Sequence, residues 1–66
     1  MTNRELVMKF WSFPLSVRYK IVNDLGLLED GDIKRTEVQR YELAFQHARE
    51  RNLTDKLFSA IEKEPM

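Results

Sequence analysis

The chain has 66 residues, of which 42% are hydrophobic and 33% are charged, and its 11 basic residues balance its 11 acidic ones. This length allows one domain, residues 1–66, and leaves no room for a deep active-site cavity inside a thick core. Because the chain has no Cys and a single His, a disulfide scaffold, a thiol catalyst and a histidine metal cluster are excluded. The balanced charge argues against nucleic acid or an anionic membrane as the partner.

The spacing of apolar residues predicts a first helix over residues 3–11. Leu6, Phe10 and their neighbours Val7 and Trp11 fall in one arc at about 100° per residue. Thr2 or Asn3 is suited to be the N-cap. The helix ends before Pro14, which has no backbone N–H to donate.

A second helix is predicted over residues 14–25, beginning at Pro14 and followed by Gly26 in a left-handed conformation. Its apolar residues cover roughly half of the helical wheel, which is typical of a central helix. Arg18 projects within this apolar arc. Its guanidinium must therefore either reach the edge of the bundle or meet a carboxylate.

The third helix is predicted over residues 36–51, after a connection that allows one short turn through Leu27, Leu28 and Ile33. Thr36 and Gln39 have the spacing of a capping box, in which each side chain bonds to the other residue's backbone N–H. A fourth helix is predicted over residues 54–63, with Thr54 as its N-cap.

The predicted fold is therefore all-α, a compact antiparallel bundle of four main helices plus the short fifth turn, without any strand. The core is expected to contain Leu6, Phe10, Val17, Ile21, Leu25, Val38, Tyr41, Phe45, Ala48, Leu57 and Ile61.

Few residues suggest chemistry. The run Glu29-Asp30-Gly31-Asp32 resembles the start of a calcium loop, but Arg35 stands where an EF-hand needs Gly and Tyr41 where it needs a bidentate acid. His47 lies opposite the apolar stripe of the third helix and is expected to be exposed, with no nucleophile to activate. We therefore expect no enzyme activity, no catalytic residue, no metal and no cofactor.

A helix-turn-helix is the alternative for the second and third helices. The connection from Gly26 to Thr36 is longer than the three or four residues of that motif. Glu37, Glu42 and Glu50 on the third helix would face phosphates unfavourably. A small DNA-binding regulator remains an alternative function, although nucleic acid is disfavoured by charge.

The surface charges suggest a docking role instead. Acidic residues gather in the loop before the third helix and Arg residues at its end, and a domain with separate acidic and basic faces can associate head-to-tail. We expect Arg18 to surface beside Arg49 in a basic patch that meets the acidic loop of a partner domain. The predicted partner-binding residues are Arg18, Arg49, Arg51, Glu29, Asp30 and Asp32.

Two stretches, Phe13–Leu27 and Phe45–Leu53 continuing to Leu57 and Ile61, resemble the small effector-associated, death-like adaptor domains of bacterial conflict and signalling proteins. The resemblance implies a helical bundle that docks like with like, bringing proteases, nucleotide-dependent switches or nucleases together. It implies a protein partner or a homo-oligomer.

We therefore predict a non-enzymatic protein-interaction module. Because charged residues interrupt every N-terminal apolar run and none approaches the roughly 20 residues of a spanning helix, we expect a cytoplasmic protein without membrane contact. A small structural or toxin-neutralising protein is the other alternative.

Overall fold

A computed structural model describes residues 2–65, apart from the side chain of Ile33, and folds them into four α-helices and one short 3₁₀ helix. Their order is α1 (Asn3–Ser12), α2 (Leu15–Asp24), η1 (Asp30–Lys34), α3 (Glu37–Glu50) and α4 (Thr54–Lys63). Residues 2–65 contain no strand, which confirms the all-α prediction, and every predicted helix boundary lies within one residue of the observed one. The expected short turn is η1. The side chain of Ile33, which was predicted to take part in this turn, lies outside the described part of the structure.

Capping explains where two of the helices begin. At α1, the Glu5 backbone N–H donates to the Thr2 hydroxyl at 3.2 Å, and the Thr2 N–H donates to the Glu5 carboxylate at 3.3 Å. Thr36 and Gln39 form the same reciprocal pair at α3, as the sequence predicts. The prediction of Thr54 as a cap is wrong. Leu53 holds the cap position of α4, and no side chain caps that helix.

Left-handed residues end α2 and α3. Gly26 has a φ of 68°, which lets the Leu27 N–H donate back to the Val22 carbonyl at 2.9 Å. Asn52, with a φ of 57°, has the same role after α3, where the Leu53 N–H donates to the Ala48 carbonyl at 2.7 Å. Both turns therefore satisfy carbonyls that the helix ends would otherwise leave unpaired.

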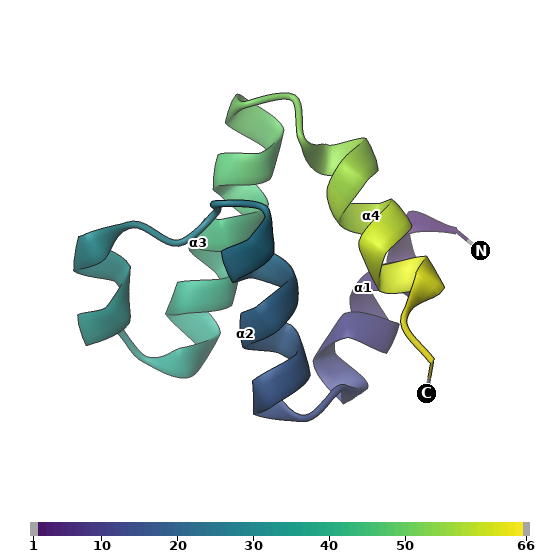
Figure 1. Cartoon of the computed structure of the whole chain (residues 1–66), viewed down its shortest axis with the longest axis horizontal. Coiled ribbons are helices and arrows are strands. Elements are labelled where there is room, and N and C mark those ends of the chain that lie inside the picture. The colour runs from purple at the N-terminus through teal and green to yellow at the C-terminus, as the bar shows by residue number, and fades with distance from the viewer. Residues whose placement is uncertain (1, 66) are drawn as a thin grey trace.

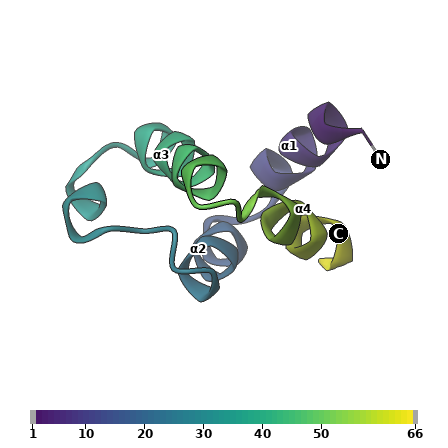
Figure 2. The same ribbon diagram turned by 90° about the horizontal axis from the view of Figure 1, so that it is seen from above.

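The connections set the directions of the helices. Short turns make α1 and α2 antiparallel, and likewise α3 and α4 (Figure 1). The longer connection between α2 and α3 carries η1 and returns the chain to the other end of the bundle, so that α3 runs in the same direction as α2 (Figure 1). Seen from above, η1 lies beside α3 and away from α1 and α4 (Figure 2).

The core lies where the four helices meet and is built around aromatic rings. The ring centroid of Phe10 lies 5.1 Å from that of Phe45 and 5.5 Å from that of Tyr41, both edge to face. The buried hydrophobic residues are Leu6, Phe10, Phe13, Ile21, Val22, Leu27, Tyr41, Ala44, Ala48, Leu57 and Ile61.

Most of the predicted core residues are confirmed, but the prediction that Val38 belongs to the core is wrong. Val38 is 54% exposed, because it lies in the first turn of α3, off the buried line of Tyr41, Ala44 and Ala48. Val17, Leu25 and Phe45 are only partly buried and pack against the core from its edge. Core residues that the prediction omitted are Phe13, Val22, Leu27 and Ala44.

Candidate interaction surfaces

Arg18 of α2 lies at the edge of the core, where its side chain contacts residues of α1 and α3. Its guanidinium lies 2.6 Å from the Glu37 carboxylate and over two aromatic rings, 5.4 Å from the Trp11 centroid and 5.2 Å from that of Tyr41. Only 14% of its side chain is exposed. This pair joins α2 to the start of α3 and gives the charge of Arg18 a partner within the chain.

The expected position of Arg18 beside Arg49 is therefore wrong. Glu37 and Arg49 stand twelve residues apart on α3, a rise of about 18 Å along a helix axis. An Arg18 bound to Glu37 cannot also lie next to Arg49. The two arginines do not form one basic patch, because the carboxylate at the start of α3 draws Arg18 to that end of the bundle.

The acidic loop before α3 lies against the basic end of α3. From the sequence it was clear only that the charges of these two segments are opposite. The Arg51 guanidinium forms an ion pair with Glu29 and donates to the Gly26 carbonyl at 2.9 Å. Asp32 is buried and accepts a hydrogen bond from the Glu29 N–H at 3.2 Å. These contacts hold the loop and η1 against α3.

His47 belongs to the same cluster, so its expected exposure is wrong. Its Nε2 lies 3.2 Å from Asp32 Oδ2 and 4.0 Å from Glu29 Oε1, and only 14% of its side chain is exposed. The error arises because η1 covers the flank of α3 that faces away from the main core. Two of the six predicted partner-binding residues, Asp30 and Arg49, are exposed and form no side-chain hydrogen bond or ion pair with the described residues.

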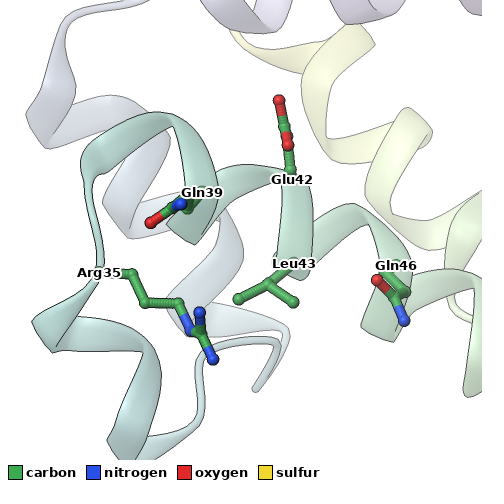
Figure 3. Close-up of a pocket in the computed structure, with 5 residues that line it drawn as sticks. All are labelled: Arg35, Gln39, Glu42, Leu43 and Gln46. Carbon is green, nitrogen blue, oxygen red and sulfur yellow. The ribbon is translucent and has the colours of Figure 1, made fainter.

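A shallow hollow lies on the outer face of α3, opposite its buried line. It has a volume of about 240 Å³. We call its lining the α3 face: Arg35, Gln39, Glu42, Leu43 and Gln46. The side chains of Arg35 and Leu43 extend into the same space, while Glu42 points away from Arg35 (Figure 3). One turn beyond, Glu50 accepts a hydrogen bond from the Gln46 amide at 3.0 Å.

A larger groove of about 490 Å³ lies between the end of α2 and the outer side of α4. We call it the α4 groove. Its apolar floor is formed by the partly buried Leu25 and Ala60, and its sides carry Lys56 and Lys63. The lining is completed by Asp55 and Ser59. The two lysines have no ion-pair partner among residues 2–65, so they are available to a partner.

Sequence reasoning missed the α4 groove. The sequence contains one indication of this groove. The small residues Ser59 and Ala60 stand between two lysines and leave space on one side of α4. That space becomes a groove only because Leu25 of α2 lies opposite, and the sequence does not state which helices are neighbours.

Both hollows are open, and among their lining residues no hydroxyl group is hydrogen-bonded to a base. Within the described residues, no group of three or more His, Asp or Glu side chains is arranged to hold a metal ion. Nor is any described helix long and apolar enough to cross a membrane.

Comparison with known protein families decides the class of this bundle. Residues 2–63 match the family model of the GTPase-associated adaptor domain. The chain belongs to this family. The match includes all four α-helices and η1, so both hollows are surfaces of the GTPase-associated adaptor domain itself. No curated protein and no solved structure matches the chain.

Proposed function

We propose that this GTPase-associated adaptor domain is a docking module that joins a GTPase to a second protein in a bacterial signalling or conflict assembly. The observation that carries the proposal is the family match, which spans nearly the whole chain. An adaptor domain acts through its surface. The α3 face and the α4 groove are open hollows on that surface.

The proposal is supported by the large hydrophobic side chains that the fold leaves in solvent. Met8, Leu15, Tyr19 and Val38 are each 42–65% exposed. Exposed apolar side chains of this size are available for burial in a contact with a protein partner. Asp30 and Arg49 remain proposed contact residues, whereas Arg18, Arg51, Glu29 and Asp32 have partners within the chain.

The test is direct binding between the purified chain and a purified GTPase of the same organism, measured by calorimetry with GDP and with a non-hydrolysable GTP analogue. We expect saturable binding at a fixed ratio. Lack of binding in both nucleotide states would contradict the proposal. Binding to a random DNA duplex at low salt would instead favour the DNA-binding alternative.

A further inference from the structure

One glutamate lies in the α3 face and a second lies just beyond it on α3, whereas two lysines line the α4 groove. Glu42 and Glu50 stand on either side of Leu43 on α3, eight residues apart, which is about 12 Å along a helix. Lys56 and Lys63 stand seven residues apart on α4, about 10.5 Å. The axial spacing of the two glutamates is therefore close to that of the two lysines.

We propose that the α3 face of one copy docks in the α4 groove of another copy. Leu43 lies on the apolar floor formed by Leu25 and Ala60, and the two glutamates meet the two lysines. This inference deepens the proposed docking function by naming a second copy of the chain as one partner and these two surfaces as the contact.

The order of charges favours one orientation. Along α3 the sequence runs Arg35, Glu42, Glu50, and along α4 it runs Asp55, Lys56, Lys63. With the two helices side by side in the same direction, the glutamates oppose the lysines. Arg35, which lies 3.9 Å from Asp32 of its own chain, is then nearer to the end that carries Asp55. The opposite orientation places Arg35 toward Lys63, at the far end of the groove.

The charges in this contact are free to pair. Glu42, Lys56 and Lys63 are exposed and form no ion pair with the described residues. Glu50 is held by the amide of Gln46, which leaves its carboxylate on the surface. Pairing of these two glutamates with these two lysines therefore breaks no ion pair of the fold, and the Arg35–Asp32 pair stays as it is.

The contact is head-to-tail, because the two surfaces differ and share no residue. Each copy therefore keeps one surface of each kind after its first contact. Heterologous contacts of this type form rings or open filaments instead of stopping at a dimer. Since the contact depends on exposed charges, salt weakens it.

Charge reversal tests the inference on the full 66-residue chain. The groove variant is Lys56→Glu with Lys63→Glu, and the face variant is Glu42→Lys with Glu50→Lys. Sedimentation of the parent from micromolar to millimolar concentration at low salt should show a mass that rises beyond the dimer. Each variant alone should lose association by at least tenfold in Kd, with an unchanged helical melt.

Mixing separates this contact from a general effect of charge. An equimolar mixture of the two variants should associate again. The groove variant keeps the acidic face, and the face variant keeps the basic groove that this face binds. The matched control, Arg4→Glu with Lys20→Glu, changes the net charge as much as the groove variant but lies outside both surfaces. It should associate like the parent.

Several results would overturn the inference: a parent that stays monomeric, a parent mass that stops at two copies, a groove variant that associates like the parent, or a mixture that stays monomeric. The calorimetric titration with the GTPase is independent of these measurements. A monomeric parent that still binds the GTPase overturns the self-contact alone, and a self-associating parent that ignores the GTPase overturns only the proposed GTPase partner.

Discussion

The guanidinium of Arg18 lies 2.6 Å from the carboxylate of Glu37, and this pair fastens α2 to the start of α3. The two helices run in the same direction and are joined by a long connection, so no short turn fixes their spacing (Figure 1). The same guanidinium lies over the rings of Trp11 and Tyr41. Arg18 therefore contributes to the fold by packing as well as by charge.

Arg18→Ala should lower the free energy of unfolding by about 1–2 kcal/mol, because it removes the stacking on two rings and leaves Glu37 unpaired. Glu37→Gln should cost less than about 1 kcal/mol, since that carboxylate is 44% exposed and solvent screens the pair. Urea unfolding followed by circular dichroism measures both. Equal losses for the two variants would show that charge, not packing, is the contribution of Arg18.

Phe10→Ala should be among the most damaging single substitutions in the chain. The ring is fully buried and contacts Trp11, Tyr41 and Phe45, so its loss should cost about 3–5 kcal/mol through lost burial and a cavity. Phe45 is only partly buried, and Phe45→Ala should cost less, about 2 kcal/mol. Thermal melts of both variants give the ranking, and the reverse order would contradict this description of the core.

The two glycines of the chain should respond in opposite ways to alanine. Gly26 has a φ of 68°, and a Cβ there would meet no atom within 4 Å. Gly26→Ala should therefore cost about 1 kcal/mol from backbone strain alone. Gly31 has no positive φ and equal space, so Gly31→Ala should be neutral or slightly stabilising. Similar melting of both variants would show that α2 does not depend on a left-handed residue.

Local signals in the sequence predicted the helices well. The Thr36–Gln39 capping box, Gly26 and Pro14 each act within one turn of their own position, so neighbouring residues are enough to recognise them. The apolar spacing likewise located Phe10, Tyr41 and Ile61 in the core.

Contacts between distant residues were not predictable in the same way. Whether Arg18 meets Glu37 or Arg49 depends on which end of α3 lies beside α2, and the long connection through η1 decides that (Figure 1). His47 has the pattern of a surface residue on α3, and only the position of η1 buries it. The α4 groove depends in the same way on Leu25 lying opposite Ala60.

Alkaline pH should destabilise the protein in part through Tyr41. Burial raises the pKa of its phenol above the ordinary value of 10.0, although the nearby charges of Arg18 and Arg40 lower it. Above pH 10 the unfolded chain can release this proton while the folded chain retains it, so the free energy of unfolding falls as pH rises from about 10.

Unfolding measured at pH 8 and at about pH 10.5 should show a smaller loss of stability in Tyr41→Phe than in the parent. Tyr19→Phe is the matched control, since that ring is 42% exposed. The control should lose as much stability as the parent over the same interval. If Tyr41→Phe also loses as much, other groups account for the alkaline effect.

Asp32 should control whether η1 stays on α3. It is buried, bonds to His47 at 3.2 Å and accepts the Glu29 N–H. Asp32→Ala removes these bonds and should weaken the attachment by about 1–2 kcal/mol. Because η1 is a short element with few neighbours, this loss should appear as local opening before global unfolding.

Amide hydrogen exchange measures that opening directly. The reporter is the Arg35 N–H, which donates to the Asp32 carbonyl at 3.1 Å, and the Ala48 amide in the centre of α3 is the internal reference. Asp32→Ala should speed exchange at Arg35 by about five- to thirtyfold, the range that 1–2 kcal/mol corresponds to, and change Ala48 less. Asp30→Ala, an exposed neighbour, should leave Arg35 unchanged. Equal acceleration at Arg35 and Ala48 would mean that η1 opens only when the whole domain unfolds, and that the His47–Asp32 contact does not hold it separately.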